Sequence, residues 1–375
     1  MPHPSSNHTA AAPTVETVNR TRATTVVLAS AAIVAAAALI AVPAIAGASP
    51  GRTAVAVPDS STLASTTGSL DGLQVVGYAE GGTPASKLRA SMPALTTIGA
   101  DGVNLTANGA DITETSPETL ALLATAHTNS KRAELLVGNF DGKLGDFSPT
   151  IAAKLLRSPD NIRTVAGALV AEVKANGWDG ISVDLESLRP ADSDGLTALM
   201  RALRSGLDAA GGGKSLSIDL MATTGDYADE GYDLAALGVI ADHVVLMGYD
   251  QHGPTWSRSG PVGGLPWVKK TLAPLLAAVP AEKVQLGIAG YGYSWPTKGK
   301  TGRVFSDAGA RAAVKKQHAE AVWSATQGEW HAKLKSGTVI WWSDKKSFTA
   351  RAALATTLGI GGVAVWSLGL SDPIG

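Results

Sequence analysis

The sequence contains no cysteine, and this absence excludes several kinds of chemistry. Without a thiol in its 375 residues, the protein can form neither a disulfide nor a thiolate metal site, and it cannot use a cysteine nucleophile. The seven histidines are scattered, and no two have the i, i+4 spacing that would direct both rings at one ion from a helix face. We therefore expect no metal and no other cofactor.

Charged residues are also scarce and balanced. They make up 17% of the chain, with 31 Lys and Arg against 32 Asp and Glu and no long run of either sign. A surface that follows phosphates needs clustered basic residues, so we expect no nucleic-acid partner. The hydrophobic content of 45% is typical of a well-buried globular enzyme.

The N-terminal region carries the features of an export signal. Residues 1–24 are polar and include Arg20 and Arg22, and residues 25–46 are apolar over about the length needed to cross a bilayer as a helix. Small residues end this run at Ala44–Ala46, so it is either a cleaved signal peptide or a membrane anchor. Residues 1–24 are then cytoplasmic, and membrane contact is confined to the N-terminal segment. The alternative is a buried, Ala-rich helix of the globular domain.

The rest of the chain divides into a linker and one domain. Residues 47–70 are rich in Pro, Ser and Thr and have the composition of a flexible tether. Residues 71–375 then form a catalytic domain that lies outside the cell or at the cell wall.

Short β-rich runs alternate with longer Ala- and Leu-rich stretches from Leu73 onward, which is typical of parallel strands joined by helices. We predict an α/β fold, a (β/α)8 TIM barrel. A doubly wound open sheet is the alternative, but no Gly-rich dinucleotide loop follows the first strand. The eight expected strands are Leu73–Tyr78, Leu95–Gly99, Glu134–Asn139, Gly180–Glu186, Ser215–Met221, His243–Tyr249, Val284–Ala289 and Gly362–Trp366.

The expected connections include three clear helices, at Asn161–Ala175, Leu196–Ala209 and Val268–Ala278. The gap between the seventh and eighth strands is too long for a single helix. Val339–Trp342 in this gap resembles a further strand. We therefore predict a small α+β insertion between strands seven and eight.

The fourth expected strand carries an acidic face. Within Gly180–Glu186, three polar residues, Ser182, Asp184 and Glu186, alternate with apolar ones. A barrel strand with this pattern turns its apolar side chains toward the outer helices and its polar side chains into the lumen. Burying two carboxylates costs several kcal/mol unless they are paired or protonated, which favours a catalytic site. The structural alternative is an acidic strand end that only caps the next helix.

The spacing of the two acids favours one kind of reaction. Residues two apart on a strand have Cα atoms roughly 6 to 7 Å apart, so each charge disfavours ionisation of the other, and one of Asp184 and Glu186 should hold a proton near neutral pH. Glycoside hydrolysis uses a neutral carboxylic acid beside a carboxylate. Glu186, at the carboxyl end of the strand, is the expected proton donor.

These residues resemble a known family. The pattern Asp179-Gly180-x-x-x-Asp184-x-Glu186 is similar to the signature of family 18 glycoside hydrolases, and Met247-Gly248-Tyr249-Asp250 and Gly362–Trp366 are similar to two further family strands. The resemblance extends from about Leu73 to Pro373. The runs Pro261–Val268 and Trp366–Leu370 most resemble the bacterial branch associated with spore-cortex and cell-wall peptidoglycan.

The resemblance implies a substrate-assisted, retaining mechanism in which the 2-acetamido group of the sugar is the nucleophile. Glu186 would be the acid and base, Asp184 would hold the acetamido N–H, and Tyr249 would donate to its carbonyl oxygen. The partner is then a β-1,4 glycan with N-acetylglucosamine, either peptidoglycan or chitin-like, and the enzyme is expected to act as a monomer. The remaining expected substrate contacts are Asp179, Tyr78, Asp250, His252 and Trp366.

One position departs from the family pattern. Ser182 stands where many members have a second Asp, and a serine cannot share a proton or charge with Asp184. Two other functions therefore stay open: a glycan-binding barrel without activity, and an anchored structural or interaction protein. The presence of Glu186 favours the enzyme.

Overall fold

The computed structural model describes residues 70–297 and 301–375. Eight parallel strands close into a barrel in the order β1-β15-β9-β8-β7-β6-β3-β2, so the predicted TIM barrel is confirmed, and each predicted strand overlaps an observed one. The strands are β1 (Gln74–Glu80), β2 (Thr97–Asn104), β3 (Arg132–Gly138), β6 (Gly180–Asp184), β7 (Ser215–Met221), β8 (His243–Met247), β9 (Val284–Ala289) and β15 (Gly362–Trp366).

The predicted export segment at 25–46 and all but the last residue of the predicted linker at 47–70 lie outside the described residues. Among the helices of the described part, none is long and apolar enough to cross a membrane.

Two strands end earlier than the sequence predicts. β6 ends at Asp184 and β8 at Met247, each two residues before the predicted end. The chain turns sharply just beyond them, with Ser187 at φ 59° and Asp250 at φ 61°. Positive φ is uncommon for residues other than glycine and takes the backbone out of the strand. Glu186 and Tyr249 therefore lie on loops at the carboxyl rim of the barrel.

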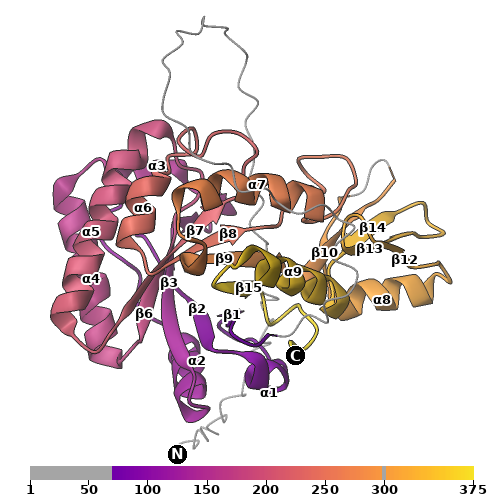
Figure 1. The fold of residues 1–375 in the computed structure, drawn as a ribbon, viewed down its shortest axis with the longest axis horizontal. Helices are drawn as coiled ribbons and strands as arrows, with labels where there is room; N and C mark the ends of the chain where they lie inside the picture. The colour runs from indigo at the N-terminus through magenta and orange to yellow at the C-terminus, as the bar shows by residue number, and fades with distance from the viewer. Residues whose placement is uncertain (1–69, 298–300) are drawn as a thin grey trace, which may run out of the picture.

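Helices cover the outside of the barrel (Figure 1). The helix α4 (Pro159–Asn176) shows why they form where they do: the Ser158 side chain accepts a hydrogen bond from the Asn161 amide, and Gly177 ends the helix at φ 82°. The other barrel helices are α1 (Ala85–Ser91), α2 (Pro117–Thr128), α3 (Pro149–Leu156), α5 (Ser193–Ala210), α6 (Leu234–Ile240), α7 (Leu265–Ala278) and α9 (Lys345–Leu358), with short 3-10 turns at Met92–Ala94, Pro190–Asp192 and Ala281–Lys283.

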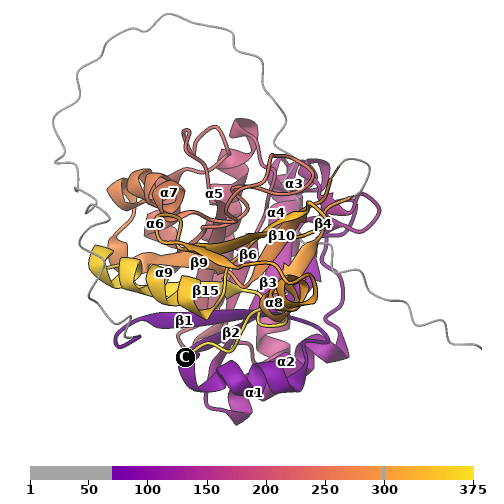
Figure 2. The ribbon, with the colours of Figure 1, turned by 90° about the vertical axis from the view of Figure 1, so that its right-hand side faces the viewer.

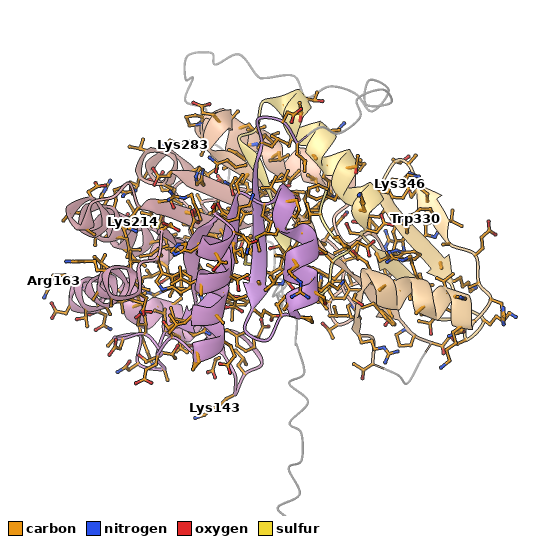
Figure 3. The ribbon with its side chains drawn as sticks, turned by 90° about the horizontal axis from the view of Figure 1, so that it is seen from below. Lys143, Arg163, Lys214, Lys283, Trp330 and Lys346 are labelled. Carbon is orange, nitrogen blue, oxygen red and sulfur yellow. The ribbon has the colours of Figure 1, made fainter. Side chains whose placement is uncertain are left out.

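The predicted insertion is confirmed between the seventh and eighth barrel strands, β9 and β15. It is a five-stranded antiparallel sheet in the order β11-β10-β14-β13-β12 with one helix, α8, and it lies to the right of the barrel in Figure 1 and in front of it in Figure 2. Lys346 of α9 lies over Trp330 of the sheet, with its Nζ atom 5.2 Å from the ring centroid (Figure 3). The elements of the insertion are β10 (Tyr291–Trp295), β11 (Val304–Ser306), α8 (Asp307–Lys316), β12 (Val322–Ser324), β13 (Glu329–Lys333) and β14 (Val339–Trp342).

The barrel interior holds polar side chains beside a small apolar cluster of Val76, Tyr78, Leu136, Val245 and Ala364, whereas the layer between strands and helices is apolar. The outward-facing residues of β6, Ile181 and Val183, are fully buried in the main hydrophobic core. The lumen instead holds the polar residues Ser182 and Asp219 together with Tyr78, all 4% exposed or less. This is the orientation that the alternation on the fourth predicted strand indicates, so the polar face of β6 points into the barrel.

Candidate active site

Asp184, the last residue of β6, and Glu186, on the loop that follows, are buried at the carboxyl end of the barrel. Asp184 and Glu186 are each 5% exposed. Burial raises the pKa of Asp184 well above its ordinary value, and the charges of Glu186, Asp219 and Asp101 raise it further. Burial likewise raises the pKa of Glu186, followed by the charges of Asp250, Asp146 and Asp219. The expectation that one of these acids holds a proton near neutral pH therefore agrees with their surroundings.

A buried asparagine fixes the backbone of Glu186. Asn139 is 0% exposed, its Oδ1 accepts from the Glu186 amide at 2.9 Å, and its Nδ2 donates to the Glu186 carbonyl at 3.0 Å. The same Nδ2 donates to the Ser148 carbonyl at 3.0 Å. A side-chain amide that pairs with both backbone groups of one residue sets the direction in which that residue points. Sequence reasoning missed this role, although a polar residue at the end of an apolar strand was its signal.

Asp250 is oriented by two tyrosines of the insertion. Its Oδ1 accepts from the Tyr291 hydroxyl at 2.6 Å and from the Tyr293 hydroxyl at 2.8 Å. Burial raises the pKa of Asp250 to about 6, and these two hydrogen bonds oppose the shift. Asp250 also raises the pKa of Glu186, so the two carboxyls interact. The tyrosines were missed because they lie on β10, far along the chain.

Aromatic residues surround the acids. The Tyr78 and Trp366 rings lie 5.7 Å apart, centroid to centroid, at an angle of 51°. Burial raises the pKa of the Tyr249 hydroxyl well above its ordinary value, and four carboxylates, those of Asp219, Asp184, Asp250 and Glu186, raise it further. The Tyr249 hydroxyl therefore lies within the electrostatic field of these acids.

A cavity of about 100 Å³ opens at this end of the barrel, and its lining includes Asp184 and Trp366 but not Glu186 or Tyr249. Phe140 and Phe147 come from the short ribbon of β4 (Phe140–Asp141) and β5 (Asp146–Phe147) that follows β3. No basic side chain contributes to the lining, which is formed by Glu80, Asp101, Asn104, Leu136, Gly138, Phe140, Phe147, Asp184 and Trp366.

His252 lies on the loop after β8, two residues beyond Asp250. Its Nδ1 is 3.2 Å from the Ser257 hydroxyl of the same loop. Burial lowers its pKa, and the charge of Arg258 lowers it further. Its contacts are within the loop, so the geometry gives it no direct interaction with the acids.

Asp179 requires a correction, because the structure places it at the opposite end of the barrel from the other predicted residues. It precedes β6, whereas Glu186 follows it, and seven residues of nearly extended chain span roughly 20 Å. Its carboxylate is 2.9 Å from both the His127 Nε2 atom and the Ala133 amide nitrogen. The motif match gave it a substrate contact, but its position gives it a structural role.

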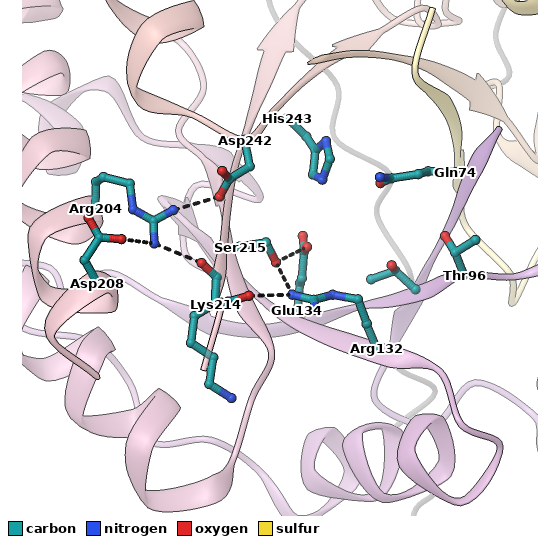
Figure 4. A pocket seen from close by; sticks show the side chains of 12 residues that line it. Gln74, Thr96, Arg132, Glu134, Arg204, Asp208, Lys214, Ser215, Asp242 and His243 are labelled. Carbon is teal, nitrogen blue, oxygen red and sulfur yellow. Dashed lines mark hydrogen bonds and ion pairs between the residues drawn. The ribbon is translucent and has the colours of Figure 1, made fainter. Parts of the chain in front are cut away.

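A larger cavity of about 810 Å³ lies at the amino end of the barrel (Figure 4). Its charged side chains satisfy one another: Arg204 pairs with Asp208 at 2.8 Å and with Asp242 at 2.7 Å. The Glu134 carboxylate accepts from the Ser215 hydroxyl at 2.6 Å, and Arg132 donates to the same hydroxyl oxygen at 3.0 Å. Catalytic groups of TIM barrels lie at the carboxyl end. We therefore assign a structural role to the cavity at the amino end and to its ion pairs.

Among the described residues, no group of three His, Asp or Glu side chains is arranged to hold a metal ion. What the carboxyl end offers is a set of partly protonated carboxyls beside tyrosines and an indole. Such a set can donate a proton to a leaving oxygen and accept it back.

The barrel and this cluster of acids together define a glycosidase. The family model of Glycosyl hydrolases family 18 matches residues 92–370. The chain belongs to that family.

The curated relatives are similar over most of the barrel. The chain is 26% identical over 241 residues to the Uncharacterized glycosylase YvbX of Bacillus subtilis, covering 62% of this chain and 70% of that protein. It is 27% identical over 279 residues to the Cortical fragment-lytic enzyme of Bacillus cereus, covering 70% of this chain and 63% of that one. The chain thus spans less than two thirds of the second relative.

A solved class V chitinase from Pseudomonas fluorescens Pf-5 has a TM-score of 0.73 and 25% identity, covering 80% of this chain and 96% of that one. The spore cortex-lytic enzyme SleL of Bacillus cereus has a TM-score of 0.70 at 22% identity, over 80% of this chain and 71% of that one, which supports the fold.

Proposed function

We propose that this protein is an exported glycosidase that cleaves β-1,4 bonds in glycans containing N-acetylglucosamine, with the acetamido group of the substrate as nucleophile. The observation that carries the proposal is an unpaired atom. Oδ1 of Asp184 is buried and has no hydrogen-bond partner among the described residues, although Asp184 lines the cavity beside Trp366. Buried polar atoms are normally hydrogen-bonded, and an acetamido N–H on a bound sugar would supply the missing donor.

The proposed reaction uses three side chains. Asp184 accepts from the acetamido N–H and directs the acetamido oxygen at the anomeric carbon, while Tyr249 donates to that oxygen. The oxygen forms a bond to the anomeric carbon as the glycosidic C–O bond breaks, and Glu186 gives its proton to the leaving oxygen. Glu186, now a carboxylate, takes a proton from water, which opens the oxazolinium ring with overall retention.

The surroundings support Glu186 in the acid role. A general acid at neutral pH needs a raised pKa, and burial together with Asp250, Asp146 and Asp219 supplies it. Asn139 fixes the backbone of Glu186, which is the positioning that a proton donor needs.

Two glycans fit this chemistry, peptidoglycan and chitin. The names of the cortical fragment-lytic relatives favour peptidoglycan, and the predicted export segment at 25–46 would bring the domain to it, outside the cell or at the wall. Both polymers carry the required N-acetylglucosamine.

The test is the Glu186→Gln variant of the purified chain, assayed on both polymers with product analysis by mass spectrometry. We expect kcat to fall by at least 10³-fold, because glutamine cannot give a proton, while affinity for N-acetylglucosamine oligomers stays within a few-fold. The matched control is Glu282→Gln, an exposed residue of the turn before β9, which should keep full activity.

Equal turnover by Glu186→Gln and the parent chain would overturn the mechanism. A parent chain that binds oligomers but releases no reducing ends would instead show a glycan-binding barrel. Proton NMR of the first product distinguishes retention from inversion, and inversion would exclude the acetamido nucleophile.

A further inference from the structure

Asp219 of β7 is the centre of a hydrogen-bond network that crosses the barrel lumen. The Tyr78 hydroxyl donates to its Oδ1 at 2.8 Å, and the Ser182 hydroxyl donates to its Oδ2 at 3.1 Å. The two hydroxyl oxygens are 3.3 Å apart. The strands β1 and β7 lie opposite each other, four places apart in either direction around the ring. Two donors from different strands therefore hold one carboxylate, 3% exposed, in a fixed place.

A missing side chain makes room for this network. Gly99 of β2 lies against the Tyr78 ring, and a Cβ atom at residue 99 would be 2.4 Å from it. That separation is far shorter than a contact between carbon atoms. The ring of Tyr78 can therefore lie across the lumen because residue 99 has no side chain.

The network adjoins the acid that is proposed to bind the acetamido group. The register pairs Val183 of β6 with Ile218 of β7, so Asp184 and Asp219 are the next residues on adjacent strands, and both side chains point inward. The charge of Asp219 contributes to the raised pKa of Asp184. Once ionised, a carboxylate on an adjacent strand favours the neutral form of its neighbour.

Ser182, the position where β6 lacks a carboxylate, is also where the network attaches. We propose that Asp219 supplies from β7 the second lumenal carboxylate that β6 lacks, and that it acts as a positioning residue that controls the charge and orientation of Asp184. This inference rests on the proposed function. Ser182 donates the hydrogen bond that orients Asp219, and it does not itself replace the missing acid.

Several other titratable groups interact electrostatically with Asp219, and the pH profile of kcat reflects all of them. Burial raises the pKa of Asp219 to about 7, and the hydrogen bonds from Tyr78 and Ser182 oppose the shift. The neighbours are Glu134 of β3, Asp184 and Glu186 of β6 and its following loop, Tyr78 of β1, and Tyr249 after β8.

The first test is Asp219→Asn in the full chain, assayed over a range of pH. We expect kcat to fall about 10²-fold with KM changed less than threefold, and the pH optimum to move, because Asp184 loses its charged neighbour. The matched control is Asp192→Asn, which removes another fully buried carboxylate, one that pairs with Arg157 at 2.9 Å outside the site. The control should lose stability but keep its kcat and pH profile.

The second test exchanges the two side chains, in the variant Ser182→Asp/Asp219→Ser. The swap keeps the same atoms in the lumen but moves the carboxylate to β6. We expect the kcat of the swap to be at least tenfold higher than that of Asp219→Asn. An Asp219→Asn variant with kcat within twofold of the parent and an unchanged pH profile would overturn the inference, as would a swap that recovers nothing.

A third readout needs no activity and so separates this inference from the proposed function. The pKa of Asp184, followed by its carboxyl carbon signal in NMR, should fall in Asp219→Asn and rise again in the swap. If Asp219→Asn does not fold, Tyr78→Phe removes one donor from Asp219 and serves the same titration. An Asp184 pKa that does not move in any variant contradicts the inference even if the parent chain is an active glycosidase.

Discussion

At the scale of the single residue, the site depends on groups that hold the reacting carboxyls as much as on the carboxyls themselves. Asn139 and Tyr291 are fully buried, yet one fixes Glu186 and the other Asp250. Both are uncharged, and both act through hydrogen bonds. The kcat of the enzyme should therefore change on substitutions that leave every acid in place.

Asn139→Ala tests this at Glu186. The variant leaves the amide and carbonyl of Glu186 without their partners, and a displacement of about 1 Å can cost about 10²-fold in rate. We expect kcat to fall 10- to 100-fold and stability to fall by about 1 to 3 kcal/mol, measured by steady-state kinetics and urea unfolding. Asn176→Ala is the control, since Asn176 is exposed and bonds only Glu172 at 2.8 Å. An Asn139→Ala enzyme with full kcat would show that Glu186 is held by other contacts.

Single residues also differ in how far their role in the site can be predicted from the sequence. Ser182, Asp184 and Glu186 were predictable as an inward-facing set because alternation on one strand is a local pattern. The partnership of Tyr78 with Asp219 was not, because 141 residues separate them and only barrel closure brings them together. Ser217-x-Asp219 has the same alternation as Ser182-x-Asp184 and could have drawn attention to β7. The sequence prediction wrongly assigned Asp179 to the substrate site because it belongs to the same sequence motif as Glu186. The two residues flank β6, so the strand holds them at opposite ends of the barrel.

At the scale of the element, a buried ion pair joins the insertion to α9, and its carboxylate also bonds the loop after β8. Arg351 of α9 and Glu329 of β13 are 2.9 Å apart and at most 1% exposed. Glu329 also accepts from the amides of Val262 and Gly263, at 2.7 and 2.8 Å. Burial raises the pKa of Glu329, and the charge of Arg351 opposes the shift. The loop that carries Asp250 and His252 is thereby fixed from the insertion side.

Arg351→Met tests this connection. It leaves Glu329 buried without its counter-charge, and breaking a buried pair in this way costs about 3 to 5 kcal/mol. Urea unfolding should show that loss, whereas Arg163→Met should lose at most about 1 kcal/mol, since Arg163 and its partner Asp160 are 71% and 82% exposed. Equal effects of the two substitutions would mean that the Arg351–Glu329 ion pair does not stabilise this connection.

The boundaries of elements were harder to predict than their existence. All eight barrel strands were found because their apolar runs are strong, but β6 and β8 end early at Asp184 and Met247. The sequence carries no glycine at Ser187 or Asp250 to indicate the positive φ found there. Such conformations persist at functional sites because the surrounding contacts hold them.

At the scale of the whole molecule, the buried acids predict how stability depends on pH. Burial raises the pKa of Asp101 to about 6, of Asp219 to about 7 and of Asp250 to about 6, each from 3.8. Between about pH 4 and 7 the folded chain therefore binds more protons than the unfolded chain, and stability falls as pH rises. The lowered pKa of Asp179 acts in the opposite direction, but only at more acidic pH.

We expect the Tm to fall from pH 5 to pH 8, measured by circular dichroism in buffers of equal ionic strength. Asp219→Asn should flatten the slope, because asparagine has no proton to lose. A Tm that rises across this window would mean that these acids do not keep their protons in the folded chain.

Barrel closure has one more consequence. Trp366 lies on β15, the strand that pairs with β1 and completes the ring. A truncated product that stops before β15 therefore contains Glu186 but lacks Trp366 and the closed lumen across which Tyr78 reaches Asp219 of β7. We expect such a fragment to show no glycosidase activity.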